Sequence, residues 1–390
     1  MEALRFTGSG SEYFKIWIVN ILLTIITLGI YYPWAKVRNK RYFYANSNLS
    51  DRNFEYHATG KQLFIGFLIA VGIFIVFQIL SQISPIMGGV LFLLLFIAIP
   101  WIIWRSLMFN MRVSSFSNVH FAFKGGLKQA YINFFVYPFL LMVAFYAPFI
   151  GSILVTKFIL ADESYEWLGS IFLVISIIFI GVVFYLYALI KKKNTEYTIN
   201  GSRYGQGIFQ TDVETKKFLM INLKTLGIAL VGFIGFGILM AMFGGGMEMI
   251  STFDPETLEQ GQVPEGFVGM IAMLYLFMII AMILIMSYSI TRQRTYVYEN
   301  TKLDEKIAFA STLRARDFAW VMLSNMLLII VSLGFAMPWA KVRLARLMLE
   351  NTLVDTSTGF DEYITQKQNE ESSLGEQIGD AFDVDVGVAF

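Results

Sequence analysis

Residues 62–81 read QLFIGFLIAVGIFIVFQILS and contain no charged side chain. An apolar run of about 20 residues can cross a hydrocarbon core of about 30 Å as a helix. Lipid offers the backbone no hydrogen-bond partner, so such a run forms a helix and not an isolated strand. Seven further segments have the same character: residues 14–34, 86–104, 130–156, 167–190, 218–243, 267–290 and 318–339. The sequence therefore predicts an all-α polytopic membrane protein.

Composition agrees with that class. Hydrophobic residues make up 56% of the chain and charged residues 15%, whereas soluble proteins average about 25% charged residues. Cysteine is absent, which excludes disulfides and thiolate chemistry. The sequence contains no recognisable nucleophile–base pair, cluster of metal-ligating residues or phosphate-binding loop. We therefore expect no enzymatic activity, no cofactor and no nucleic-acid partner.

The loops between these segments differ in charge. Residues 35–61, 105–129, 191–217 and 291–317 together carry 22 lysines and arginines. The alternate loops carry a single lysine and are acidic or uncharged: residues 82–85, 157–166 and 244–266. Basic residues in short loops mark the cytoplasmic side of a membrane. The sequence thus predicts basic loops inside the cell and acidic loops outside.

This orientation conflicts with eight full crossings, because the bases Lys341, Arg343 and Arg346 would then lie outside. The conflict disappears if segments 14–34 and 318–339 enter from the cytoplasm and return. Each contains a Leu-Gly pair followed by a proline, which breaks a helix. We therefore predict six full transmembrane helices plus two re-entrant or broken helices, with both termini cytoplasmic; eight transmembrane helices are the alternative.

The two broken segments are also similar in sequence. Residues 12–47 align with residues 317–352 at 14 identical positions, including Pro-Trp-Ala-Lys-Val-Arg at 33–38 and again at 338–343. A looser pattern follows the other helices, where stretches such as 42–60 and 195–209 alternate aromatic or β-branched residues with polar ones. Such stretches indicate short strand–turn–strand connections that pair into a small cytoplasmic sheet.

These features divide the chain into two parts. Residues 1–354 form a transmembrane domain built from internal repeats. Residues 355–390 are rich in Asp, Glu, Ser and Gln, with Lys367 as their single base. That composition predicts an acidic, mostly disordered cytoplasmic tail.

Several short motifs resemble the YjgN-like family of bacterial inner-membrane proteins, a domain of unknown function. They are Phe6-Thr7-Gly8, Glu12-Tyr13-Phe14, Leu28-Gly29-Ile30-Tyr31, Trp34-Ala35-Lys36-Val37-Arg38, Arg41-Tyr42-Phe43-Tyr44 and Phe54-Glu55-Tyr56-His57. The resemblance covers nearly the whole chain. It implies a bacterial inner-membrane location and carries no established activity.

Two groups of residues are candidate sites. Polar or small residues inside the broken segments could line a cavity: Asn20, Thr24, Thr27, Gly29, Asn325, Ser332 and Gly334. Polar groups in a bilayer face protein or water, so the alternative is that they only bond to a neighbouring helix. The repeated motif offers a cytoplasmic mouth or lipid-headgroup contact: Trp34, Lys36, Arg38, Trp339, Lys341 and Arg343. Here the alternative is a simple anchor at the membrane interface.

Two functions fit these observations. We favour a transporter or channel-like protein for a small solute or lipid, in which the two broken segments meet and enclose a polar cavity. The alternative is a non-transporting membrane protein that binds lipids or organises partners in the envelope. Membrane lipids are expected partners in both.

Overall fold

The computed structural model describes residues 1–161, 166–242, 267–357 and 359–386. Within these residues, six helices are long and apolar enough to cross a membrane: Gly60–Ile83, Pro85–Arg112, Leu127–Lys157, Trp167–Gly201, Thr215–Ile238 and Ile271–Glu299. They coincide with the six full spans predicted from the sequence. Most of the two acidic loops falls on residues 162–165 and 243–266, which lie outside the described residues.

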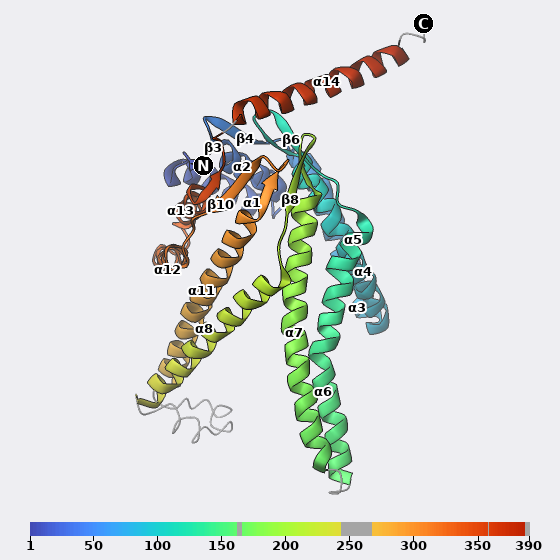
Figure 1. The fold of residues 1–390 in the computed structure, drawn as a ribbon, viewed down its shortest axis with the longest axis vertical. Helices are drawn as coiled ribbons and strands as arrows, with labels where there is room; N and C mark the ends of the chain where they lie inside the picture. Colours follow the sequence, from blue (N-terminus) through green and yellow to red (C-terminus); the bar gives the residue numbers. More distant parts are fainter. Residues whose placement is uncertain (162–165, 243–266, 358, 387–390) are drawn as a thin grey trace.

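The spans form three long helical hairpins that extend from one end of the molecule (Figure 1). Each hairpin has one helix leaving that end and one returning to it: α3 (Gly60–Ile83) with α4 (Pro85–Arg112), α6 (Tyr137–Ala161) with α7 (Glu166–Gly201), and α8 (Thr215–Met242) with α11 (Phe267–Glu299). Two short elements, α5 (Leu127–Tyr131) and the π-helical η1 (Ile132–Val136), lead directly into α6.

Two shorter hairpins come from the ends of the chain. They are α1 (Gly10–Ile26) with α2 (Tyr32–Ala45), and α12 (Ala315–Val331) with α13 (Met337–Glu350). The helices break at the Leu-Gly pairs, where Leu28 and Leu333 both have φ of 49° and the following glycines have φ of 90° and 91°. Residues that carry a side chain rarely adopt this left-handed backbone conformation. Glycine therefore suits the second position of each pair. Figure 1 views α12 end-on, across the long helices.

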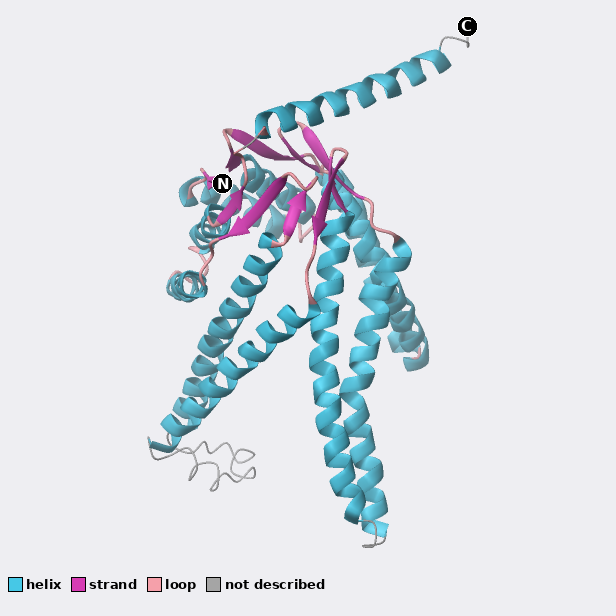
Figure 2. Ribbon diagram, viewed as in Figure 1, coloured by secondary structure: helices cyan, strands magenta, loops and turns pink. Residues whose placement is uncertain are grey.

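The connections between hairpins join into one sheet at the end where the hairpins meet (Figure 2). Its strands are β1 (Glu2–Ala3), β2 (Arg5–Phe6), β3 (Ser47–Leu49), β4 (Arg52–Tyr56), β5 (Ser114–Phe116), β6 (Val119–Phe123), β7 (Ser202–Tyr204), β8 (Gly207–Thr211), β9 (Thr301–Leu303), β10 (Ile307–Ser311) and β11 (Thr352–Val354). The order is β1-β11-β10-β9-β8-β7-β6-β5-β4-β3-β2. The strand–turn–strand pieces predicted at residues 42–60 and 195–209 thus belong to an eleven-stranded sheet, and the all-α class misses this layer.

The sheet closes on itself. β1 and β2 stand at opposite ends of the strand order, yet only Leu4 separates them in the chain. Residues 2–3 pair with β11 and residues 5–6 pair with β3. Each long strand elsewhere also pairs with two short strands, as β4 does with β3 and β5. We call this closed sheet the β-ring; closure leaves no free edge for aggregation.

The tail differs from the expectation of disorder. Residues Phe360–Val386 form α14, which lies across the sheet end (Figure 1). Phe360, Tyr363, Ile364 and Lys367 are buried, and their spacing of three and four residues places them on one helix face. The sequence pattern does not reveal this buried face, because it consists of only four residues in an otherwise acidic and polar segment.

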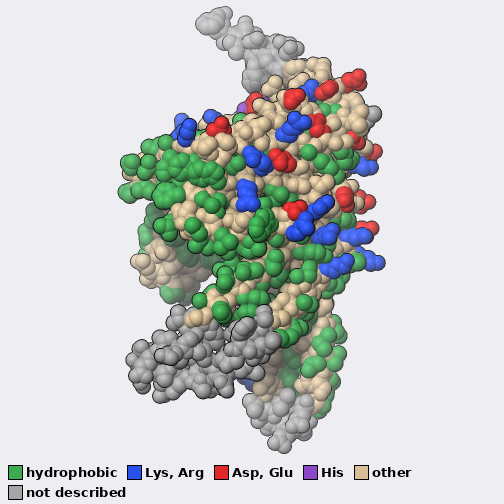
Figure 3. Space-filling model, turned by 90° about the vertical axis from the view of Figure 1, so that its left-hand side faces the viewer, with side chains coloured by type: hydrophobic (Ala, Val, Ile, Leu, Met, Phe, Trp, Pro, Cys, Tyr) green, Lys and Arg blue, Asp and Glu red, His purple; other side chains and the backbone are tan. Residues whose placement is uncertain are grey.

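Apolar and charged surfaces are separated along the molecule. In Figure 3, acidic and basic side chains gather around the sheet end, and hydrophobic side chains dominate lower on the visible face. Many apolar residues of the spans are exposed to the surroundings, such as Ile69, Leu93 and Ile177. Such a belt suits lipid contact.

Candidate functional site

Asn20, predicted to line a cavity, instead joins the two arms of its own short hairpin. Its side chain is buried, and its Nδ2 donates to the Asn39 Oδ1 at 3.0 Å and the Ala35 carbonyl at 3.5 Å. Arg38 donates to the Asn20 Oδ1 at 3.3 Å. This geometry fits the packing alternative.

The second short hairpin has the same arrangement. Asn325 donates to the Ala340 carbonyl at 3.0 Å, and Arg343 contacts the Asn325 Oδ1 at 3.5 Å. The hydroxyls bond to backbone carbonyls within their own helices: Thr24 to Asn20, Thr27 to Leu23, and Ser332 to Ile329. Gly29 and Gly334 occupy the turns, with open space where a Cβ would be.

The predicted mouth residues pack between neighbouring hairpins or point outward. Trp34 lies against Gly60 of α3, and Trp339 lies against Gly10 of α1. A Cβ added to either glycine would meet the tryptophan Cδ1 at 2.2 Å. α13 therefore contacts α1 as α2 contacts α3, which closes the circle of hairpins. Lys36 and Lys341 are exposed.

A different site lies on the axis of the β-ring. A cavity of about 670 Å³ is bounded by the β-ring and by the ends of the helices that return to it. No charged residue is among its 17 lining residues. We call this cavity the axial chamber.

The β-ring supplies the floor of the axial chamber through the third residue of each five-residue strand and through Leu4, which joins β1 to β2. These five apolar residues, which we call the helix-side ring, are Leu4, Phe54, Phe121, Phe209 and Phe309. The returning helices supply the walls three residues before each short strand: Tyr44, Met111, Ile199, Tyr298 and Leu349. All five returning helices therefore contribute this position to the chamber lining.

Hydroxyl groups mark the boundary between helix and strand. The first residue of each short strand donates its hydroxyl to the carbonyl four residues earlier, at 2.7–2.8 Å: Ser47, Ser114, Ser202, Thr301 and Thr352. The first four of these line the axial chamber. The hydrogens of these four hydroxyls are therefore already donated, and the lining also includes the polar side chains of Tyr44, Asn110, Thr198 and Tyr298.

The far side of the β-ring carries a second apolar set. The third residue of each short strand is buried, and we call this set the distal ring: Leu49, Phe116, Tyr204, Leu303 and Val354. Phe360, Tyr363 and Ile364 of α14 pack onto it. Aromatic pairs such as Phe54–Phe116, with centroids 4.6 Å apart, connect the two rings. The axis is thus filled by side chains and covered by α14.

Polar contacts fix α14 over the distal ring. The Tyr363 hydroxyl donates to the Asp304 Oδ2 at 2.8 Å, and Lys367 lies 3.4 Å from the same oxygen. Burial alone would raise the pKa of Asp304, but bonds from the Ile208 N–H and Tyr363 and the charge of Lys367 outweigh it and lower that pKa. Burial and the bond to Asp304 raise the pKa of Tyr363.

The two histidines lie side by side, and both are exposed. Their rings are 4.9 Å apart. His120 Nδ1 is 2.7 Å from the Glu371 Oε1, and His57 Nε2 is 2.7 Å from the Ser115 hydroxyl. Among the described residues, no three His, Asp or Glu side chains are grouped to hold a metal ion. His120 therefore contacts α14 directly, whereas His57 contacts Ser115 of β5.

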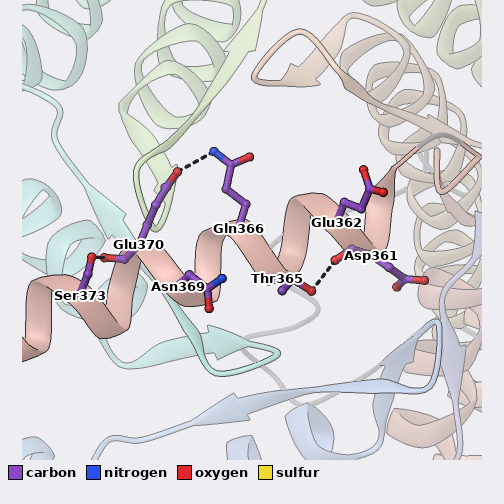
Figure 4. Close-up of a pocket in the computed structure, with 7 residues that line it drawn as sticks. All are labelled: Asp361, Glu362, Thr365, Gln366, Asn369, Glu370 and Ser373. Carbon is purple, nitrogen blue, oxygen red and sulfur yellow. Dashed lines mark hydrogen bonds between the residues drawn. The ribbon is translucent and has the colours of Figure 1, made fainter.

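A hollow of about 810 Å³ on the outer face of α14 is less informative. All seven of its lining residues belong to α14 (Figure 4). The hydrogen bonds among them stay within the helix, as in Gln366 to Glu370 at 2.9 Å, and Asp361 also lies 3.2 Å from Arg52 of β4. One helix face encloses nothing, so we regard this hollow as open surface.

The axial chamber escaped the sequence interpretation, although a signal exists. The five segments that enter outgoing helices read EALRFTGSG (2–10), RNFEYHATG (52–60), VHFAFKGGL (119–127), GIFQTDVET (207–215) and IAFASTLRA (307–315). Each has an apolar third residue. Their identities are too few to align by eye, whereas their backbone bonds match: residues 7, 57, 124, 212 and 312 all donate an N–H to the residue before the neighbouring short strand.

The chain is similar to several known bacterial inner-membrane proteins over most of its length. Inner membrane protein YjgN of Salmonella typhimurium is 31% identical over 366 residues, covering 90% of this chain and 88% of the relative. Inner membrane proteins YjgN of Escherichia coli K12 and O157:H7 are each 28% identical over 359 residues, covering 89% of this chain and 87% of the relative. No solved structure matches.

The resemblance seen in the sequence motifs is confirmed. The relatives are named as inner-membrane proteins, and six apolar helices fit a multi-pass protein of that membrane. A family model described as bacterial protein of unknown function (DUF898) matches residues 1–381, so the chain belongs to this family.

Proposed function

We propose that the protein takes the apolar chain of a lipid-like molecule from the inner membrane into the axial chamber. Of the two substrates considered for a transporter-like protein, a small solute and a lipid, this proposal selects the lipid. The observation that carries it is the cavity of about 670 Å³ lined without a charged residue. A drug-sized or acyl-chain ligand fits pockets of about 300–1,000 Å³ with apolar walls. No chemical step on the ligand is needed.

The composition of the chamber walls disfavours a hydrophilic channel. Rings of carbonyls or charged side chains select ions, whereas nine of the 17 residues that line this chamber are apolar and none is charged. A small ion would lose its hydration water there without gaining a charged partner. The same walls accept a hydrocarbon chain at little cost.

The short hairpins complete the proposed membrane arrangement. Their tips are apolar and exposed: Leu28 is 93% and Leu333 88% exposed. Arms of 17 and 14 residues reach about 25 and 21 Å at 1.5 Å per residue, so they suit re-entry better than crossing. We place the β-ring, α14 and both termini in the cytoplasm, and read the chain as five related helical hairpins.

Transfer beyond binding requires the distal side to open. α14 covers the distal ring, and the ring side chains fill the axis. We therefore assign α14 the role of a cover that limits passage between the axial chamber and the cytoplasm. The non-transporting alternative keeps this cover permanently closed.

The binding step is tested by filling the chamber. Full-length protein in lipid nanodiscs is titrated with a polyene fatty acid whose fluorescence increases in apolar surroundings. Ile199→Trp adds bulk to the chamber wall and should weaken saturable binding at least tenfold. Ile208→Trp is the matched control, because Ile208 neighbours Phe209 on β8 but is absent from the chamber lining and is 38% exposed.

Equal binding by both variants, with unchanged thermal unfolding, would overturn the chamber as the binding site. Transfer is tested with a chain ending at residue 356. Faster movement of the same probe out of proteoliposomes supports the covered-passage reading; an unchanged rate supports the non-transporting alternative.

A further inference from the structure

A second kind of hollow lies between the arms of the α8/α11 hairpin. It has a volume of about 410 Å³, and its walls come only from these two helices. Three bases line it, Lys217 and Lys224 from α8 and Arg292 from α11. All three are exposed. Glu299 is the one acid in the lining. We call this hollow the basic groove.

The positive charge of the basic groove is not compensated by the protein's described part. Among the described residues, no carboxylate oxygen lies within 4.0 Å of Lys217, Lys224 or Arg292. Arg292 rests on the face of Tyr288, with 5.7 Å between its Cζ and the ring centroid. Such an arrangement orients a guanidinium while leaving its N–H groups available.

Helix length places the groove near the membrane boundary. α11 has 33 residues and extends about 50 Å at 1.5 Å per residue, more than a hydrocarbon core of about 30 Å. Its excess must protrude, and Arg292 lies seven residues before its end at Glu299. Lys224 lies within a span, so its charge must reach the interface.

Every hairpin has a basic residue at the position equivalent to Arg292. Nine residues before the first residue of each short strand stands a lysine or arginine: Arg38, Arg105, Lys193, Arg292 and Arg343. In α3/α4 the equivalent Arg105 lines a hollow of about 550 Å³ with Arg112. In the short hairpins Arg38 and Arg343 bond to Asn20 and Asn325 instead.

We infer that the basic groove binds the phosphate headgroup of an anionic membrane lipid. Three bases, two tyrosine rings and a position at the end of the spans match a phosphate whose acyl chains lie along the exposed apolar faces of α8 and α11. This site is separate from the axial chamber, since the two share no lining residue. It holds a lipid as a fixed component of the protein.

The test uses the full chain in nanodiscs of phosphatidylcholine with a small fraction of phosphatidylglycerol. Native mass spectrometry counts the phosphatidylglycerol retained. The triple variant K217Q/K224Q/R292Q should retain it with about a hundredfold lower affinity, because each base near an anionic surface contributes roughly a factor of five. The matched control K216Q/K302Q/K306Q removes three exposed bases outside the groove and should retain the lipid.

Three results would overturn the inference. They are equal retention by the triple variant and the unchanged chain, equal loss in the matched control, and displacement of the lipid by millimolar inorganic phosphate, which would assign the groove to free phosphate. A folding defect is recognised by comparing R292K, which keeps the charge and should retain most of the binding at unchanged thermal stability.

Discussion

The β-ring carries two apolar rings, the distal ring on its short strands and the helix-side ring on its long strands, and the two have different surroundings. On the distal face, Leu49 and its equivalents are covered by α14. On the opposite face, Phe209 and its equivalents border an uncharged cavity of about 670 Å³. Both rings are apolar because a closed sheet turns alternate residues of each strand inward. The chain thus covers the distal ring with its own helix and leaves the helix-side ring bordering the axial chamber.

The largest effect should come from the covered face. Ile364 is 1% exposed beneath α14, so Ile364→Asp buries an unpaired charge and should cost more than about 3 kcal/mol of docking free energy. α14 would leave the distal ring. Spin labels at Thr365 and Lys302, both exposed, would report a broad distance distribution in place of a narrow one.

A charge at the next position provides the control. Thr365→Asp, read with labels at Gln366 and Lys302, should keep the narrow distribution because Thr365 is exposed. If the distance distribution of Ile364→Asp also stays narrow, polar contacts hold α14 in place. The apolar cover of the distal ring would then not distinguish it from the helix-side ring.

The closed circle of hairpins keeps both faces in place and gives the second effect. Gly10→Ala and Gly60→Ala each drive a Cβ against a tryptophan, and overpacking of this kind costs about 1–3 kcal/mol. We expect similar losses of thermal stability in detergent for the two variants. Gly66→Ala, with nothing within 4 Å of its Cβ, should be neutral or slightly stabilising. A harmless Gly10→Ala would contradict closure between α13 and α1.

Much of this layout follows from the sequence, for identifiable reasons. Continuous apolar runs give the six spans, because lipid leaves the backbone no other choice. The Leu-Gly pairs give the breaks near Leu28 and Leu333, since only local φ values are involved. Predictions of this kind need no knowledge of distant residues.

The axial chamber and the docking of α14 depend on contacts far apart in the chain. Leu4 and Phe309 both belong to the floor of the axial chamber although 305 positions separate them in the chain. Asn20 and Asn325 look alike whether they line a cavity or join two helix arms; only the position of Ala35 or Ala340 decides. The four-residue stripe of α14 has meaning only once the distal ring exists.

A smaller effect concerns the pH range of the cover. Asp304 has a lowered pKa in the docked state, so its contribution is present above its ordinary value of 3.8 and is lost as the pH falls through the folded value. The raised pKa of Tyr363 acts oppositely: its contribution is present below the ordinary value of 10.0 and is lost at higher pH. Spin-label distances should therefore broaden below about pH 4.

Removing one of these partners should reproduce part of that loss. Tyr363→Phe deletes a single hydrogen bond and should weaken docking by about 0.5–1.5 kcal/mol, while the Ile208 N–H and Lys367 still contact Asp304. Tyr363→Phe should be measured by the denaturant needed to broaden the spin-label distances. No change in that concentration would show that the Asp304 contact is unimportant for α14.

The smallest effect is expected at the edge of the cover. Arg52 lies 3.2 Å from Asp361, whose side chain is 80% exposed. An exposed ion pair contributes about 0–1 kcal/mol, so Asp361→Asn should shift the same denaturant midpoint less than Tyr363→Phe does. A larger shift for Asp361→Asn than for Tyr363→Phe would contradict the view that the buried contact contributes more to docking than the exposed one.

The most direct test of the axial chamber is photo-crosslinking in native membranes with a fatty acid that carries a diazirine near its methyl end. Peptide mass spectrometry should then find the label on residues of the chamber walls, such as Tyr44, Ile199 and Tyr298, and Ile199→Trp should remove it from all three helices together. Labelling confined to exposed residues of the spans, such as Ile69 and Leu93, and insensitive to Ile199→Trp would contradict a ligand in the chamber.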